Sequence, residues 1–435
     1  MGGACYRDRA ALRAAPTSEY AMIDILRSAH RPRIGLGRFL SVAGPGIVVM
    51  LADTDAGSVI TAAQSGAQWG YKLLVLQFVL IPILYVVQEL TVRLGIVTGE
   101  GHAALIRRHF GRGWAWISVS ALLVACVGAL LTEFAGLAGI GAMIGVSPRA
   151  TMILVVLTLT LIAVTGSYKS VERIALGVGL FELAFLVVAV VAHPTMGELL
   201  RDAGSVPFGD PKYLLLVSAN IGAVIMPWMV FYQQSAVIEK GLVTADLPAA
   251  RADTLAGSVV TQLIMAAVLV STAAALSHGP TKTLDTVQQI ADALTQVLGS
   301  TSGRLCFGLG IAGAAIVAAI VVTLTAARTL GELLGYAHSL DKPLVEAPWF
   351  YGMYALTLAA GALVVLSGAS LVQLSVYVQV MNAMLLPLVL GFLFLLARRL
   401  PPPYRLEGTA AAVTGLLMTV TVVLGLYSGI AGLFS

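Results

Sequence analysis

Four acidic side chains lie inside long apolar stretches of the sequence: Asp53, Asp55, Glu133 and Glu182. A buried carboxylate without a partner is costly, so acids in such surroundings are candidates for a function. No lysine or arginine stands at the same depth to neutralise the two aspartates. A bound cation can do so. We therefore predict a cation site at Asp55, with Asp53 beside it.

Two interruptions of apolar stretches supply further ligands. Residues 52–58 read Ala-Asp-Thr-Asp-Ala-Gly-Ser, and residues 222–227 read Gly-Ala-Val-Ile-Met-Pro. An unwound helix has free backbone carbonyls, and we expect those of Ala52 and Ala223 to face the site. Carboxylate, hydroxyl and carbonyl oxygens suit a hard divalent cation, whereas the Met226 thioether favours a transition metal.

Each candidate also has a purely structural interpretation. Asp55 is suited to capping a helix, and Asp53 is equally well explained as a solvated or pore-lining charge. Methionines such as Met226 pack in many helices without a ligand role, but this one directly precedes a proline. Glu182 fits either a polar contact between helices or a cation path, and Gln379 fits a hydrogen bond between helices.

The composition places these residues in a membrane. The chain is 58% hydrophobic and 11% charged, which is more apolar than a water-soluble domain of its length. A transmembrane helix needs about 20 apolar residues. Eleven stretches meet this need, near residues 43–66, 71–93, 115–140, 149–166, 173–193, 213–239, 254–277, 304–330, 350–369, 371–396 and 409–431. We predict an all-α membrane protein whose residues 41–435 form a single transport domain.

The basic residues and the two interruptions predict the topology. With residues 1–40 as a basic cytoplasmic arm, 20 of the 26 lysines and arginines fall inside and 6 outside. The positive-inside rule then gives an inner (plasma) membrane protein with a cytoplasmic N-terminus and an extracytoplasmic C-terminus. The interrupted helices are the first and the sixth. Paired breaks at corresponding places of two halves predict an inverted-repeat transporter with a midplane site.

Other functions find little support in the residues. The three cysteines, Cys5, Cys126 and Cys306, are too scattered for a disulfide framework or a thiolate metal site. No nucleophile with its base and no cofactor motif indicates an enzyme or a resident cofactor. The formal charge of +4 is explained by the topology, so no nucleic acid is expected. Nothing indicates an obligate protein partner, and no signalling domain supports a receptor.

Several motifs resemble the natural resistance-associated macrophage protein (NRAMP) family. They are residues 55–58, residues 93–99 (Arg-Leu-Gly-Ile-Val-Thr-Gly), Glu133 among small residues, residues 222–227, and Gln379-Val380 with Pro387. The similarity runs from about residue 40 to residue 396. It implies a leucine-transporter-like fold of two inverted repeats, helices 1–5 and 6–10, with helices 1 and 6 broken.

The resemblance also implies the ligands of a transported divalent metal. They are four side chains and two backbone carbonyls, namely Asp55, Ser58, Met226, Gln379 in some states, and the carbonyls of Ala52 and Ala223. Glu133 matches the acid that the family places on its proton route.

The sequence departs from the family at four places. Residues 55–58 replace Asp-Pro-Gly-Asn, so the shorter Ser58 hydroxyl stands for an amide. Met-Pro-His-Asn becomes Met226-Pro227-Trp228-Met229, Gln233 replaces a second histidine, and the arginine pair of helix 9 is missing. We expect all six histidines in loops or at helix ends, which excludes an intramembrane histidine relay. These substitutions are similar to those of the NRAMP-related magnesium transporters, which carry Mg²⁺ and Mn²⁺ without evident proton coupling.

Three transport functions stay open at this point. The first is uncoupled transport of Mg²⁺ or Mn²⁺ by alternating access, in which Ser58 and Asp53 suit a hydrated Mg²⁺ and Met226 favours Mn²⁺. The second is a proton-coupled Mn²⁺/Fe²⁺ symporter with Glu133 as its sole proton carrier. The third is a sodium-coupled amine or amino-acid transporter on the same fold. Glu182 belongs to a possible proton or cation path in each case.

Overall fold

The computed structural model describes residues 42–165, 168–276, 284–336, 342–366 and 371–434. Helices are the only regular elements in this part of the chain. They are α3 (Pro45–Asp53), α4 (Ala56–Trp69), α5 (Leu74–Thr98), α6 (His102–Phe110), α7 (Arg112–Met143), α8 (Pro148–Thr165), α9 (Tyr168–Gly179), η1 (Leu180–Leu183), α10 (Ala184–Val191), α11 (Met196–Ala203), α12 (Pro211–Val224), α13 (Pro227–Glu239), η2 (Thr244–Asp246), α14 (Leu247–Leu276), α15 (Val287–Leu298), α16 (Ser300–Leu334), α17 (Pro348–Val365), α18 (Leu371–Ala397) and α19 (Gly408–Leu433).

The predicted membrane spans are confirmed. Among the described residues, ten helices are long and apolar enough to cross a membrane, and the bent pair α3–α4 makes an eleventh span. Their boundaries differ from the expected ones by a few residues, most at α14, which begins at Leu247 rather than near residue 254. The predicted arm of residues 1–40 lies outside the described residues, so the division into arm and transport domain stays a prediction.

Both expected interruptions are present, and they differ in shape. Helix α3 ends at Asp53 and α4 begins at Ala56, with a bend of 50° between them. Helices α12 and α13 are separated by Ile225 and Met226 but continue as one span, Pro211–Glu239. Pro227 explains this second break, because it lacks an N–H and disfavours helical geometry in the residue before it.

A third interruption was not predicted. The fifth span contains a 3₁₀ turn, η1, between α9 and α10, where the sequence indicated one continuous helix. Short 3₁₀ segments inside a helix often mark a functional position. Glu182 lies in this turn.

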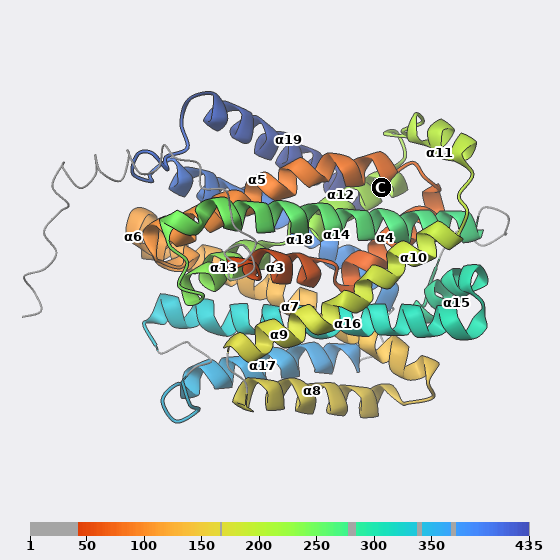
Figure 1. The fold of residues 1–435 in the computed structure, drawn as a ribbon, viewed down its shortest axis with the longest axis horizontal. Helices are drawn as coiled ribbons and strands as arrows, with labels where there is room; N and C mark the ends of the chain where they lie inside the picture. Colours follow the sequence, from red (N-terminus) through yellow and green to blue (C-terminus); the bar gives the residue numbers. More distant parts are fainter. Residues whose placement is uncertain (1–41, 166–167, 277–283, 337–341, 367–370, 435) are drawn as a thin grey trace, which may run out of the picture. The chain divides into compact units, whose positions relative to one another are not determined.

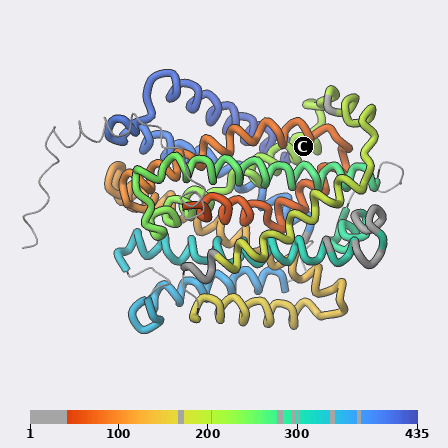
Figure 2. Tube along the Cα trace, in the orientation of Figure 1, coloured from red at the N-terminus to blue at the C-terminus, as the bar shows by residue number. Residues whose placement is uncertain are grey.

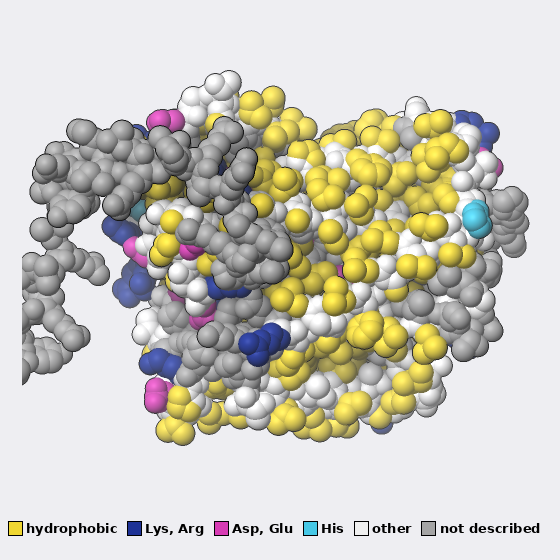
Figure 3. All heavy atoms as spheres, in the orientation of Figure 1, with side chains coloured by type: hydrophobic (Ala, Val, Ile, Leu, Met, Phe, Trp, Pro, Cys, Tyr) yellow, Lys and Arg dark blue, Asp and Glu magenta, His cyan; other side chains and the backbone are white. Residues whose placement is uncertain are grey.

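The helices pack so that both predicted breaks are enclosed. Helix α14 packs along α3, α4 and α5, and α12 lies between α18 and α19 (Figure 1). The trace in Figure 2 shows α8 and α17 side by side at one edge, where both pack against α7. Apolar side chains cover the middle of the surface in Figure 3, and charged side chains gather towards its ends. This distribution is typical of a protein surrounded by lipid.

Candidate metal site between two broken helices

Asp55 caps the second half of the first broken helix. Its backbone is extended (φ −68°, ψ 169°), and its Oδ1 accepts a hydrogen bond of 2.6 Å from the Ser58 N–H. The capping interpretation is therefore right as far as geometry goes. The cap uses Oδ1, whereas Oδ2 is buried without a hydrogen bond of ordinary length, and the Glu133 carboxyl group interacts with the same carboxylate. A cap that leaves one oxygen free in a fully buried position is consistent with a cation ligand.

The bend at the first break frees a backbone carbonyl. In an unbroken helix the N–H of Ala56 would bond the carbonyl of Ala52. Here it donates instead to Glu133 Oε2 of α7, at 3.1 Å. The other carboxylate oxygen of Glu133 accepts a hydrogen bond of 3.1 Å from the Thr132 hydroxyl. Glu133 thus replaces the Ala52 carbonyl as the acceptor for the Ala56 N–H. The Ala52 carbonyl is left without its usual helical donor.

Pro227 frees a second carbonyl by a different route. Ala223 stands four residues before it, so the helical donor to the Ala223 carbonyl is missing. The Ser58 hydroxyl donates to this carbonyl oxygen at 3.1 Å. The two breaks are therefore bonded directly to one another, and Ser58 and Ala223, both predicted ligands, lie in contact.

The thioether of Met226 has an unexpected partner. The Trp228 indole N–H lies 3.2 Å from Met226 Sδ and donates to it, and both side chains are fully buried. Trp228 stands where the NRAMP resemblance places a histidine. The tryptophan therefore occupies part of the lone-pair density on sulfur that a soft metal would use.

Helix α18 brings Gln379 to the same place. A Cβ added at Gly57 would lie 2.6 Å from Gln379 Nε2, and one at Gly222 would lie 1.8 Å from the Gln379 carbonyl oxygen. Both broken helices therefore touch α18 through glycines. Asn382 donates to Gln379 Oε1 at 2.9 Å, but Gln379 Nε2 is buried without a partner.

Asp53 is the last residue of α3 and is only 2% exposed, with Oδ1 unpartnered. This burial argues against its interpretation as a solvated charge. The neighbouring Thr54 was missed by the sequence reasoning. Its hydroxyl lies 2.7 Å from the Thr261 hydroxyl of α14 and 3.1 Å from the Met50 carbonyl oxygen, so it fixes the end of α3.

The predicted site residues are buried together around the two breaks. Asp55, Ser58, Met226, Ala52, Ala223, Gln379 and Asp53 are all at most 4% exposed. Within the described ranges, no group of three or more histidines, cysteines and acids is arranged to hold a metal. The candidate site consists instead of carboxylate, hydroxyl, carbonyl and thioether groups. The ligand roles themselves stay a prediction.

The described histidines lie outside the membrane spans, but one of them is buried. His102 begins the short helix α6, is 1% exposed, and its Nδ1 lies 3.0 Å from Gln234 Oε1 on α13. Burial lowers the pKa of His102 to about 4. The sequence predicts only a loop position for His102, whereas in the structure it is buried and contacts the second half of α13. Gln233, by contrast, donates to the Thr254 hydroxyl at 3.1 Å.

Ion pairs join the helix ends on one side of the molecule. Glu89 pairs with Arg93 and with Arg251, the latter at 2.7 Å, and Arg328 pairs with Glu239. These pairs link the end of α5 to the beginning of α14, and the end of α13 to the end of α16.

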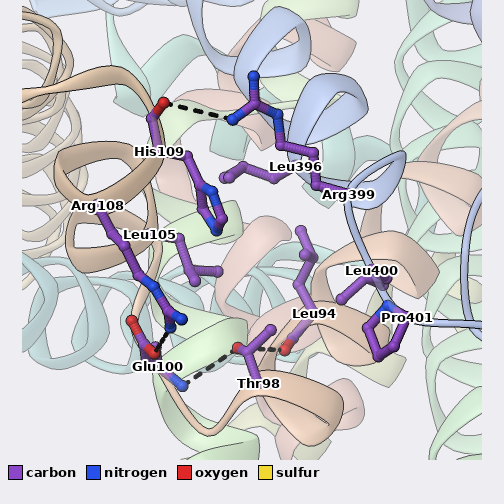
Figure 4. A pocket seen from close by; sticks show the side chains of 10 residues that line it. All are labelled: Leu94, Thr98, Glu100, Leu105, Arg108, His109, Leu396, Arg399, Leu400 and Pro401. Carbon is purple, nitrogen blue, oxygen red and sulfur yellow. Dashed lines mark hydrogen bonds and ion pairs between the residues drawn. The ribbon is translucent and has the colours of Figure 1, made fainter.

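A separate cavity lies at these helix ends, away from the breaks. It has a volume of about 230 Å³ and lies between the ends of α5 and α18 and helix α6. Figure 4 shows the Glu100–Arg108 ion pair and the bond from Arg399 to the His109 carbonyl at its wall. Its lining includes none of the predicted metal ligands.

Comparisons with known proteins agree with this architecture. The chain is 26% identical to the divalent metal cation transporter MntH of Verminephrobacter eiseniae over 83% of this chain and 82% of that one. It is 26% identical to MntH of Aeromonas hydrophila over 89% of this chain and 95% of that one. Its fold matches a crystal structure of the Eremococcus coleocola manganese transporter with a TM-score of 0.73, 18% identity, and coverage of 91% and 88%. The profile described as natural resistance-associated macrophage protein-like matches residues 46–431, so the chain belongs to the NRAMP family.

Proposed function

We propose that this protein carries divalent metal cations across the membrane by alternating access. The observation that carries the proposal is the junction of the two breaks, where Asp55, Ser58 and Ala223 meet with a carboxylate oxygen left unpartnered. MntH proteins, named as divalent metal cation transporters, are relatives over most of the chain. Binding of a dication at this junction would neutralise Asp55 and satisfy its free oxygen.

The preferred ion within this proposal is Mg²⁺, with Mn²⁺ also carried. Mg²⁺ takes oxygen ligands and keeps several of its waters, so the short Ser58 side chain suits it. The hydrogen bond from Trp228 to Met226 Sδ supports the same choice, because it weakens the one soft donor of the set. Mn²⁺ tolerates oxygen and sulfur ligands together, so the remaining sulfur density still favours its transport.

Transport without proton coupling completes the proposal. A proton route needs a chain of titratable groups leading from the site. None of the described histidines lies inside a span, and Gln233 and Trp228 stand at the family's histidine positions. Glu133 is the exception, since it contacts the first break through the Ala56 N–H. This contact, together with the interaction of Glu133 with the Asp55 carboxylate, is the structural support for a proton symporter.

Uptake into proteoliposomes at a clamped voltage tests all three parts of the proposal. Mg²⁺, Mn²⁺ and Ca²⁺ are compared while an internal dye reports pH. We expect Mg²⁺ and Mn²⁺ uptake without acidification, increasing with an inside-negative potential by about 2.3 kcal/mol of driving force per charge per 100 mV.

Acidification that scales with metal influx and disappears in Glu133→Gln would overturn the uncoupled mechanism in favour of the symporter. Sodium-dependent uptake of an amine or amino acid, with no metal uptake, would overturn metal transport altogether.

A further inference from the structure

Glu182 is buried in a way that a carboxylate rarely is. Its side chain is 0% exposed, neither of its two oxygens makes a hydrogen bond of ordinary length, and the Thr54 hydroxyl is the polar group that interacts with its carboxylate. Most buried polar atoms in proteins are hydrogen-bonded, so a carboxylate whose one polar contact is a hydroxyl group can accept a further partner. The ligands assigned above do not include this residue.

Close packing of the fifth span against two other helices brings Glu182 into the interior of the protein. It lies in the 3₁₀ turn η1, just after Gly179, where an added Cβ would lie 2.7 Å from the Leu51 side chain of α3. On the other side, a Cβ at Gly313 of α16 would lie 2.7 Å from the Val178 carbonyl oxygen. The two glycines therefore let the fifth span approach α3 and α16 closely at this turn.

The neighbours of Glu182 are acidic and hydroxylic. The side chains that act on its carboxylate are those of Thr54, Asp55 and Asp53. Asp53 has an orphaned Oδ1 of its own and is influenced by Asp55. No lysine or arginine of the described chain is among the groups that act on these three acids. When these acids are ionised, their charge therefore has no basic partner among the groups that act on them.

We propose a second cation position at this junction of α3, η1 and α16, held by the Glu182 and Asp53 carboxylates and the Thr54 hydroxyl. It takes the same divalent cargo as the site at Asp55, and so it rests on the proposed function. Two carboxylates neutralise one dication, and all its donors are oxygens, whereas the site at Asp55 includes a thioether. Asp53 lies two residues before Asp55 in the sequence. It connects the two positions and allows an ion to pass between them.

Direct binding of Mn²⁺ to the purified full-length protein tests the proposal without measuring transport. Equilibrium dialysis gives the number of ions per chain, and electron paramagnetic resonance reports whether two Mn²⁺ ions lie near one another. We expect about two ions per chain at saturation, one at the Asp55 site and one at the position held by Glu182 and Asp53. Dipolar coupling between the two ions should broaden the spectrum.

Two conservative variants separate the positions. Glu182→Gln and Asp55→Asn each keep side-chain volume, and each should retain about one Mn²⁺ with an unbroadened spectrum. Glu346→Gln is the matched control, because this acid is 60% exposed and far from any predicted ligand in sequence, and it should bind as the wild type does.

The failures of the two proposals are distinguishable. One ion in the wild type that is lost in Asp55→Asn but kept in Glu182→Gln would leave the site at Asp55 intact and overturn the second position. One ion that is lost in both variants would mean a single shared site and also overturn it. Absence of Mn²⁺ binding to the wild type would overturn the proposed function itself.

Discussion

Both broken helices free a backbone carbonyl inside a membrane span, but different residues cause the two breaks. The first break bends by 50° and carries acids, with Asp55 capping one half and Glu133 bonding the exposed N–H of Ala56. The second contains no acid and continues as one span. It is made by Pro227, which removes a donor rather than adding an acceptor. The most apolar part of that span is 94% buried inside the protein.

Within the proposed function, we infer from this difference that the two breaks have separate tasks. The first supplies charge, which decides whether a dication binds at all. The second supplies a carbonyl and a thioether, which adjust how well one dication is distinguished from another. Ser58 joins the two through its bond to the Ala223 carbonyl. Substitutions at each break should therefore have effects of different kind and size.

The largest effect should come from the charged break. Asp55→Ala removes the capping carboxylate and its free oxygen, and we expect divalent cation uptake to fall by at least about 100-fold, the upper range for loss of a metal-supporting group. The loss of the cap alone costs only about 1 kcal/mol of stability, so the protein should stay folded and monodisperse. Radioactive Mn²⁺ uptake in proteoliposomes measures the change.

Asp55→Asn serves as its control, because an amide oxygen still caps α4 while the charge is gone. Wild-type Mn²⁺ uptake by a monodisperse Asp55→Ala protein would contradict the assignment of the charged task to this break.

The uncharged break should change selectivity rather than abolish uptake. Met226→Ala should reduce Mn²⁺ and Cd²⁺ transport by about tenfold, and Mg²⁺ transport less, because only the softer ions gain from sulfur. Trp228→Phe should act in the opposite direction, since it removes the N–H that donates to Met226 Sδ and keeps an aromatic ring.

The selectivity of both variants is measured as the inhibition of Mn²⁺ uptake by competing Mg²⁺. Equal losses for all three metals in Met226→Ala would mean that the thioether only shapes the cavity.

The link between the breaks should have a moderate effect. Ser58→Ala removes the hydrogen bond to the Ala223 carbonyl and leaves that buried oxygen unsatisfied, at a cost of about 1–3 kcal/mol. We expect a lower Tm in detergent and a reduced apparent affinity for Mg²⁺. Ser58→Thr keeps the hydroxyl and is the matched comparison. An unchanged Tm in Ser58→Ala would show that the two breaks are held together by packing alone.

The smallest effect should come from His102, which contacts α13, the helix that follows the uncharged break. The folded state lowers the pKa of His102 from its ordinary 6.5 to about 4, because burial against α13 disfavours the charged ring. Between pH values of about 4 and 6.5, the unfolded state therefore binds more protons than the folded state. The free energy of unfolding decreases as the pH falls from about 6.5 towards 4.

Thermal unfolding at pH 7.5 and at pH 5 measures this effect. The loss of Tm should be smaller in His102→Gln, which cannot titrate and still reaches Gln234. A loss of the same size in this variant would assign the pH dependence to other groups.

Much of this arrangement could be predicted from the sequence, because the membrane makes apolar length and interrupted helices easy to recognise. The spans follow from the apolar stretches, and both predicted breaks follow from the residues around Asp55 and Pro227. Ser58 and Ala223, which lie in contact, were named as ligands of one site through the family resemblance. The 3₁₀ turn at Glu182 could not be predicted, because no proline marks it and its cause is close packing on two other helices.

Two further features depend on tertiary contacts that no local pattern encodes. His102 lies in a polar loop of the sequence but is buried against a distant helix. Trp228 was recognised as a replacement for a histidine, yet its bond to the Met226 sulfur depends on side-chain orientation at the break. Side-chain direction of this kind is decided by the packed structure and not by composition.

The position of a bound Mn²⁺ ion shows whether the two breaks together form the metal site. Crystals of the protein soaked in Mn²⁺ should be measured for anomalous scattering at the manganese edge. We expect a peak between the two breaks, within ligand distance of the Asp55 carboxylate and the Ala223 carbonyl. Its absence there in a protein that transports Mn²⁺, or a strong peak only at a place remote from both breaks, would contradict this expectation.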